Sequence, residues 1–328
     1  MVAPPSLDRA AAAGGPTDGR PLIDWRLAAA TAVRLAPAGP SVEAAEAREM
    51  ITGLRRAAVV AQGHVRRLTG LDPAGPRPTY VIDRASWIRA NAAGLGEVTD
   101  HLAPAPTGRW ARTAAAAGWR RTVRGGYGLV AGGALAALAP RVLGQFDLYG
   151  EGGRLLLVVP NIVGMCRKLD LDPADFRLWV CLHEETHRVQ HQQAPWLAGR
   201  LAELVGTAVG DGPEADEAID TITSLMSVVE GHADVVMDKV GTDVIATLPT
   251  IRRRFDARRA DRSGLMGVLG RLVGLDRKME QYRTGAAFCR GVEREVGPAG
   301  FARVFDGPEM MPTPAELTAP ERWLARVA

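Results

Sequence analysis

The sequence predicts a mainly helical α+β protein with a small sheet. Most of the 328 residues lie in segments whose apolar side chains recur at helical spacing, whereas short aliphatic runs typical of strands are few. Apolar residues make up 47% of the chain and charged residues 23%, with a net charge of +3. This composition is typical of a globular protein with a sizeable core, and it excludes the disordered and collagen-like classes.

The N-terminal third is expected to form a layer of helices that follows a flexible tail. Residues 1–20 are rich in proline, glycine and alanine, and they lack the continuous apolar stretch of a signal peptide. Two amphipathic stretches follow, separated by the break APAGPS. We therefore predict three regions: the tail at 1–20, an N-terminal helical layer at 21–125 that packs on the core, and a main region at 126–328.

Two short stretches predict strands. Residues 80–82 form a β-branched and aromatic run that leads into a helix, and residues 153–162 read GRLLLVVPNI. The EGG turn at 151–153 is expected to join this second stretch to the preceding run as a hairpin. Because Pro160 cannot donate a hydrogen bond to a ladder, we place strand 153–162 at a sheet edge, where an extended peptide could pair with it.

Three features of the composition bear on partners and location. The most apolar run, at 128–140, is shorter than the roughly 20 residues that span a bilayer, so we expect no membrane span. We expect a buried helix there, with an interfacial segment as the alternative. The three cysteines form no CxxC pair, which favours a reducing, cytoplasmic setting. The basic run at 252–259 is interrupted by Asp256 and is typical of a solvated helix face, so no nucleic acid partner is expected. The oligomeric state is left open.

Two long helices are marked by start and stop signals. The first is expected at about 173–194, with Asp172 as its N-cap and Pro195 just after its end. The second is expected at about 214–240 and ends at Gly241. These two helices carry the residues on which a functional prediction depends.

The first of these helices contains the sequence HEETH. His183 and His187 are four residues apart, so both imidazoles lie on one helix face and can bind one ion. Glu184 lies beside that ion rather than on it, a position that suits a carboxylate acting as general base for water. The alternative is that both histidines are polar residues on an ordinary amphipathic helix.

A third ligand would favour the metal site, because catalytic zinc usually has three protein ligands and keeps a fourth position for water. The second helix reads VVEGHAD and supplies Glu230, with Asp234 one turn further along the same face. If Glu230 binds the metal, Asp234 is placed to hydrogen-bond a ligand imidazole. A metzincin pattern is disfavoured, since it would require glycine and histidine where the chain has Gln190 and Gln193.

These residues make the chain similar to the gluzincin group of zinc metallopeptidases, in which a helix with HExxH precedes one with ExxxD. The chain more closely resembles a family of uncharacterised bacterial zincin-like proteins, some of them associated with deazaflavin-coenzyme biosynthesis. The segments that carry this resemblance span about 140 to 290 and read VLGQFD, VVPNI, HEETHRVQ, VEGHADVVMD and KMEQYRTGAAF. The resemblance implies a zincin-like metalloprotease fold with a small sheet over the HExxH helix, a Zn2+ ion bound by His183, His187 and Glu230, and Glu184 as general base.

Three further residues are candidates for a role near this set. His191 lies two turns, about 12 Å, along the helix from His183, so we expect it to be solvated or to support the ligands. His232 is two positions from Glu230 and points away from its face, which favours a packing or substrate-side role. Tyr282 and His232 are the candidate donors for the charge of a tetrahedral intermediate, although Tyr282 could equally be a core residue with its hydroxyl at the rim.

We therefore expect a zinc-dependent hydrolase that acts on a peptide or protein substrate, with 126–328 as its zincin-like catalytic region. The alternative is a protein that keeps zinc as a structural element and acts as a binding or assembly partner. Glu184 favours the enzyme, because a purely structural site needs no base beside an open coordination position.

Overall fold

The computed structural model describes residues 23–71, 78–100, 114–148, 153–208, 212–260 and 281–327. The expected flexible tail at 1–20 lies outside this range. By its internal contacts the chain divides into two units, one formed by Met1–Pro37 and Arg84–Pro140 and the other by Ala38–Asp83 and Arg141–Ala328. This division falls at other residues than the expected boundary between 125 and 126, because Ala38–Asp83 folds with the C-terminal part of the chain.

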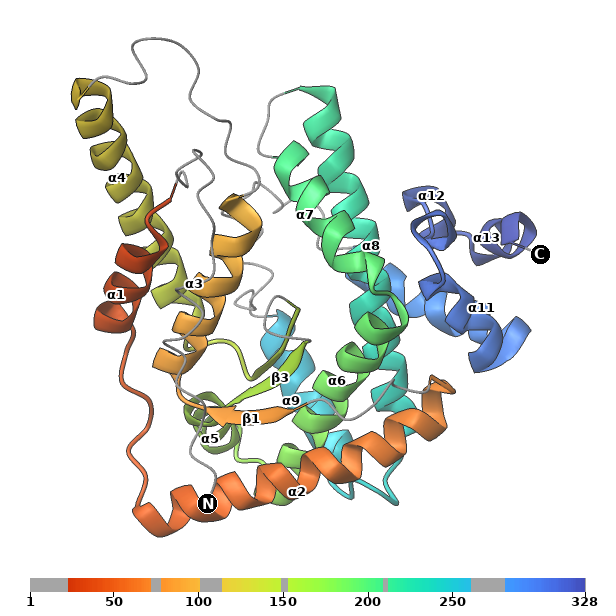
Figure 1. Cartoon of the computed structure of the whole chain (residues 1–328). Coiled ribbons are helices and arrows are strands. Elements are labelled where there is room, and N and C mark those ends of the chain that lie inside the picture. Colours follow the sequence, from red (N-terminus) through yellow and green to blue (C-terminus); the bar gives the residue numbers. More distant parts are fainter. Residues whose placement is uncertain are drawn as a thin grey trace. The chain divides into compact units, whose positions relative to one another are not determined.

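The described part of the smaller unit is helical. It consists of α1 (Trp25–Leu35), α3 (Arg84–Asp100) and α4 (Ala114–Leu138), and α1 packs against both of the others (Figure 1). Trp25 of α1 donates a hydrogen bond from Nε1 to Oγ1 of Thr99 in α3, at 2.8 Å. These helices therefore form a layer from the N-terminal third, as the periodicity predicts.

The apolar run at 128–140 lies in α4, and only part of it is buried. Gly128 and Gly132 face the start of α1, where a Cβ on either would come within 2.8 Å of a backbone oxygen. Leu129 and Val130 are 52% and 69% exposed. The expectation of a buried helix is thus wrong for this side of α4, because the glycines rather than the large side chains make the contact. No helix of the described ranges is long and apolar enough to cross a membrane.

The larger unit contains a three-stranded sheet. Its strands are β1 (Thr79–Ile82), β2 (Gly144–Asp147) and β3 (Arg154–Val158), in the order β1-β3-β2. The central strand β3 pairs in parallel with β1 and antiparallel with β2. The predicted strand at 80–82 and the predicted pairing of 153–162 with the run before it are confirmed.

The strand predicted at 153–162 is shorter than expected and lies at a different place in the sheet. It ends at Val158, and it is the central strand rather than an edge. Pro160 lies in the first turn of α5 (Val159–Lys168), where its missing N–H breaks no hydrogen bond. Leu155 to Val158 are buried although their side chains alternate between the two faces of the sheet, so both faces of β3 are covered.

Two helices of the larger unit agree closely with their sequence signals. α6 (Pro173–Gln193) begins after Asp172, whose side chain accepts hydrogen bonds from two backbone N–H groups of the first turn. It packs against α2 (Ala44–Thr69) and the sheet (Figure 1). α8 (Pro213–Lys239) ends just before Gly241, which has a φ of 77°. The predictions for 173–194 and 214–240 are confirmed.

The remaining helices follow α6 in the chain, and three of them, α7, α11 and α12, contact α8. Both α7 and α11 pack against α8, and α9 contacts α6. These elements are α7 (Trp196–Ala208), α9 (Leu248–Ala260), α11 (Gln281–Ala302), the short helices η4 (Arg303–Phe305) and η5 (Pro308–Met310), α12 (Pro314–Leu317) and α13 (Pro320–Val327).

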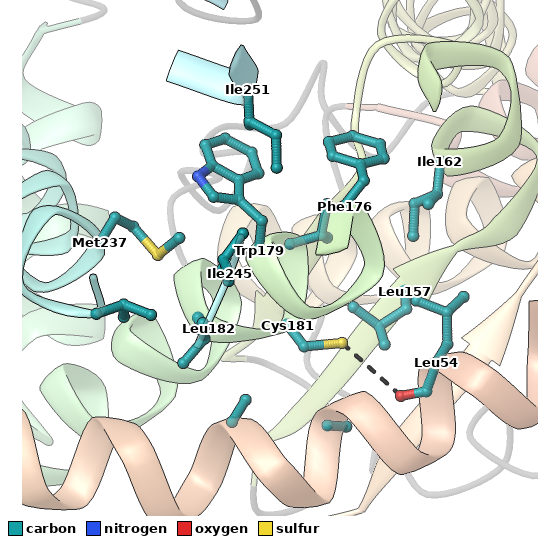
Figure 2. Packing of buried hydrophobic residues seen from close by; sticks show 14 of the residues in the cluster. Leu54, Leu157, Ile162, Phe176, Trp179, Cys181, Leu182, Met237, Ile245 and Ile251 are labelled. Carbon is teal, nitrogen blue, oxygen red and sulfur yellow. Dashed lines mark hydrogen bonds between the residues drawn. The ribbon is translucent and has the colours of Figure 1, made fainter. Parts of the chain in front are cut away.

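Two apolar clusters hold the larger unit together. The first joins α2, the sheet, α5, α6, α9 and the C-terminal end of α8. Figure 2 shows Phe176, Trp179 and Leu182 of α6 in this cluster, together with Met237 of α8. The second cluster joins α7, α8, α11 and the C-terminal helices around the buried Trp323. Because α8 contributes to both clusters, it is fixed relative to α6.

Candidate metal centre

The three predicted metal ligands converge between α6 and α8. His183 and His187 lie one turn apart on α6, and their Nε2 atoms are 3.1 Å apart. Glu230 of α8 places one carboxylate oxygen 3.7 Å from Nε2 of His183 and the other 3.6 Å from Nε2 of His187. One ligand atom from each residue therefore lies within 4.8 Å of the other two.

This donor set fits a zinc ion. Ligand atoms bound tetrahedrally at about 2.0–2.2 Å from an ion are about 3.3–3.6 Å apart. The shortest distances between the three side chains, 3.1, 3.6 and 3.7 Å, are close to this, although the two distances to Glu230 involve different carboxylate oxygens. Two imidazole nitrogens and one carboxylate are also a ligand set of catalytic zinc sites, which keep a fourth position open. The residues could thus hold zinc and still leave room for a reacting group.

Close backbone packing supports α8 next to Glu230. A Cβ on Gly231 would come within 2.4 Å of the backbone of Gly285 in α11, and a Cβ on Gly285 would come within 2.0 Å of the backbone oxygen of Ser227. Only glycine at both positions permits this approach. α11 therefore supports the segment of α8 that carries the third ligand.

Glu184 is buried beside the three ligands, with 7% of its surface exposed. Burial raises the pKa of its carboxyl to about 7, although His187 lowers it and Glu230 raises it further. The carboxylate lies against Gly144 at the start of β2, where a Cβ would come within 2.5 Å of Cγ of Glu184. A carboxyl group with a pKa near 7 can accept and release a proton at neutral pH, which is what a general base must do.

Asp234 lies one turn beyond Glu230 and contacts Arg252 of α9. Its Oδ1 accepts a hydrogen bond from Nη1 of Arg252 at 3.1 Å, and its backbone oxygen accepts one from Nη2 at 2.8 Å. Burial lowers the pKa of His187, but Glu230 and Glu184, with a smaller contribution from Asp234, raise it on balance. Asp234 is therefore near the ligands, and its expected hydrogen bond to an imidazole stays a prediction.

The basic run at 252–259 is anchored at its first residue rather than fully solvated. The side chain of Arg252 is 19% exposed and forms ion pairs with Asp234 and Asp238 of α8. The preceding residue, Ile251, is fully buried. The prediction of a solvated face is wrong at Arg252, because α9 turns this residue towards the acidic side chains of α8.

Gln190 connects His187 with α8, a contact that the sequence analysis did not identify. Nδ1 of His187 lies 2.9 Å from Oε1 of Gln190. Nε2 of Gln190 donates to the backbone oxygen of Val229 at 2.9 Å and lies 3.0 Å from Nδ1 of His232. The spacing could have indicated this role, because a residue three positions after a ligand lies on the same side of the helix.

His232 is a buried packing residue. It lies against the rings of Phe301 and Phe305, with ring centroids 4.7 and 5.6 Å away. Burial, followed by the charges of Lys239 and His187, lowers the pKa of its imidazole to about 3. This environment agrees with the packing alternative, and it gives His232 no surface with which to contact a substrate.

The structure describes the surroundings of His191 but not the side chain of Tyr282. The ring of His191 stacks on Phe146 of β2 with centroids 5.6 Å apart, and burial together with His187 lowers the pKa of His191 to about 3. His191 is therefore half-buried against β2 rather than fully solvated, and its expected support of the ligands stays a prediction. Tyr282 belongs to the first turn of α11, but its side chain is outside the described residues. Its role as a donor stays a prediction.

Comparisons with known proteins agree with this architecture. The family described as zincin-like metallopeptidase matches residues 23–211 and 206–324, so the chain belongs to this family. No curated protein matches. A crystal structure of a protein from Chloroflexus aurantiacus, provisionally described as a hydrolase with a novel fold, is similar with a TM-score of 0.73 and 30% sequence identity. The match covers 93% of this chain and 98% of that one.

Membership of the family confirms the zincin-like, mainly helical α+β fold and supports the hydrolase class. The finer expectations of a particular mechanism and substrate go beyond what either match contains. Neither match connects the chain with deazaflavin-coenzyme biosynthesis, so that part of the resemblance has no support here.

Proposed function

We propose that this protein is a zinc-dependent hydrolase that cleaves peptide bonds in a peptide or protein substrate. His183, His187 and Glu230 are the zinc ligands, and Glu184 is the general base. The observation that carries the proposal is the convergence of three ligand atoms beside a buried carboxylate that has no hydrogen-bond partner among the described residues. A zinc ion and the water that it activates require such an arrangement, whereas an ordinary amphipathic helix does not.

Glu184 performs the proton transfers in this proposal. A bound zinc ion would supply Lewis-acid chemistry, polarising the scissile carbonyl and making water more acidic. Glu184 lies next to His187 and Glu230, so its carboxylate is placed to accept the proton of an attacking water. The protonated group can then release that proton to the leaving amine.

The substrate is proposed to lie along β2. Since β3 is the central strand, the edge that the sequence assigned to 153–162 belongs to β2 and β1 instead. β2 begins at Gly144, against which Glu184 packs. An extended peptide that paired with the side of β2 facing away from β3 would therefore pass close to the base.

The proposed setting is the cytoplasm. Cys166, Cys181 and Cys289 are all buried, and none of them forms a disulfide. A reducing compartment keeps thiols in this state, whereas secreted proteins more often join theirs in disulfides.

Zinc content and peptide hydrolysis of the purified full chain test this proposal. Elemental analysis is expected to find one zinc per chain in the wild type and in Glu184→Gln, and much less in His187→Ala and Glu230→Ala. His64→Ala is the matched control, because His64 lies on α2 and bonds Arg67 of the same helix. Hydrolysis of a quenched-fluorescent peptide library by the zinc-loaded protein is expected to fall about 10²–10⁴-fold in Glu184→Gln.

The possible outcomes separate the metal site from the activity. Zinc lost from both ligand variants but kept by the control supports the site, whereas a wild type that takes up no zinc after reloading overturns it. A wild type that binds zinc but hydrolyses no peptide would favour the alternative, a protein that keeps zinc as a structural element and acts as a binding or assembly partner.

A further inference from the structure

Gln190 is buried between the two ligand-bearing helices, and its hydrogen bonds reach both of them. Its side chain extends from α6, three positions after His187, and no part of the residue is exposed. On α8 it contacts Val229 and His232, which lie on either side of Glu230 in the sequence. A single amide therefore touches one proposed ligand directly and the helix of another.

The backbone oxygen of Val229 determines which way the amide of Gln190 is turned. A carbonyl oxygen only accepts hydrogen bonds, so the amide group 2.9 Å from it must be the NH₂ group. Oε1 of Gln190 then faces His187. The flipped amide would bring two acceptors together in a buried place and leave both without a hydrogen, which is unfavourable.

This orientation assigns the hydrogen atoms of two histidines. Because Oε1 of Gln190 is an acceptor, Nδ1 of His187 must be the donor across the 2.9 Å contact. The other nitrogen of neutral His187, Nε2, then has a lone pair directed to the proposed zinc site. The second hydrogen of the Gln190 amide points to Nδ1 of His232, which must accept it, so His232 carries its own hydrogen on Nε2.

Glu293 of α11 supports the assignment for His232. Its Oε1 lies 4.0 Å from Nε2 of His232 and has no hydrogen bond within the described ranges. Its other oxygen forms an ion pair with Lys239 of α8. A carboxylate oxygen on this side of the ring favours a hydrogen on Nε2 through simple electrostatic attraction.

Given the proposed zinc site, we infer that Gln190 is the positioning residue that keeps His187 in its Nδ1–H form and so directs the Nε2 lone pair at the ion. Val229 and His232 hold the amide in the orientation that this requires. The same bonds connect α6 to α8 next to Glu230, and they thereby keep ligands from two helices in register. This support by Gln190 is separate from the support expected of Asp234.

The hydrogen positions are measured first, on the metal-free full chain. Two-bond ¹H–¹⁵N spectra of protein labelled with ¹⁵N-histidine distinguish the two ring tautomers at a pH of about 9, where imidazoles are neutral. His187 is expected as Nδ1–H and His232 as Nε2–H, with His187→Ala and His232→Ala identifying the signals. In Gln190→Leu, which keeps the size but removes the acceptor, His187 is expected to become a mixture of both tautomers.

Zinc affinity is measured second, by competition with a chelator. Gln190→Leu is expected to weaken binding by about 10–100-fold, the usual effect of removing a hydrogen-bond partner of a ligand histidine. Gln193→Leu is the matched control, since Gln193 is exposed at the end of the same helix. Gln190→Glu loses the donor to Val229 but still accepts from His187, so it is expected to bind zinc more tightly than Gln190→Leu does.

Each result decides between the role of Gln190 and the zinc site itself. If the wild type binds zinc and Gln190→Leu binds it equally well, Gln190 does not position His187, and the proposed function still stands. An Nε2–H form of His187 in the metal-free wild type overturns the inference in the same way. A wild type that binds no zinc overturns the proposed function and the role of Gln190 together. If Gln190→Leu does not fold, the wild-type tautomers and the affinity of Gln190→Glu decide the question.

Discussion

Glu184 and Glu185 are neighbours on α6, but their carboxylates lie on different sides of the helix in opposite environments. Glu185 lies on the side of Arg188, which donates to it from Nε at 2.7 Å and also from Nη2, and both residues are buried. Glu184 lies on the side of the ligands and β2 and has no hydrogen bond to another described residue. Burial raises the pKa of both carboxyls; Arg188 counteracts this for Glu185, whereas the pKa of Glu184 reaches about 7.

This difference separates a structural charge from one that is available for chemistry. In a buried ion pair the partner satisfies the hydrogen bonds of the carboxylate, which then has a structural role. A buried carboxyl without a partner is unfavourable for folding, and its shifted pKa is typical of functional sites. The comparison therefore points to Glu184, and not Glu185, as the base of HEETH.

Removing the charge of Glu185, which pairs with Arg188, is expected to have the largest effect on stability. Glu185→Gln leaves Arg188 buried without its counter-charge, which lowers the free energy of unfolding by about 3–5 kcal/mol. Glu203→Gln is the matched control: Glu203 and Arg200 have the same spacing of three residues but are exposed, so a loss below about 1 kcal/mol is expected. Urea denaturation measures both variants, and equal losses would contradict the distinction between the two pairs.

Because of Glu184, the metal-free protein is expected to become less stable as the pH rises. The pKa of Glu184 is about 7 in the folded chain, above its ordinary value of 4.5, so the folded state keeps a proton that the unfolded state has already lost. The contribution of Glu184 to the free energy of unfolding is fully present below pH 4.5 and is lost as the pH approaches 7. The loss amounts to at most about 3 kcal/mol.

Urea denaturation of the metal-free wild type and Glu184→Gln across this pH range tests the sign. Glutamine resembles the protonated carboxyl at every pH, so the two proteins are expected to be similar near pH 4.5, with the wild type less stable near pH 7. A difference in stability that does not change with pH would show that burial of Glu184 is compensated by some other contact.

The smallest effect is expected from displacing Glu184 without removing it. In Gly144→Ala the new Cβ would come within 2.5 Å of Cγ of Glu184, so the carboxylate must move. We expect kcat to fall about 10–100-fold, because the Glu184 carboxylate is moved away from the position in which it would accept the proton. Zinc content is expected to be unchanged. Gly199→Ala on α7 is the control, since a Cβ there meets nothing within 4 Å. Unchanged kcat in Gly144→Ala would argue against Glu184 as the base.

The helices that carry the centre could be predicted because their signals are local. Asp172 caps α6 through hydrogen bonds to the next turn, and Gly241 ends α8 by adopting a positive φ. The placement of His183 and His187 on one face follows from helix geometry alone. For the same reason the pairing of β2 with β3 could be expected, because few residues separate them in the sequence.

The sheet order was less predictable, and Pro160 shows why. Proline is unsuited to the middle of a ladder, but it is equally suited to the first turn of a helix. The sequence contains both possibilities, and the structure ends β3 at Val158 and begins α5 there. Whether β3 is an edge or central then depends on β1, which lies more than 70 residues earlier in the chain.

The sequence by itself determined the mainly helical class, the extent of α6 and α8, and a pair of histidines ready to bind one ion, because these depend on neighbours within one or two turns. Only the tertiary structure decided that Glu230 meets both histidines, that Gln190 bonds Val229 and His232, and that Gly144 lies against Glu184. Such contacts join residues far apart in the chain. They form only when the packing of whole helices and strands has brought those residues together.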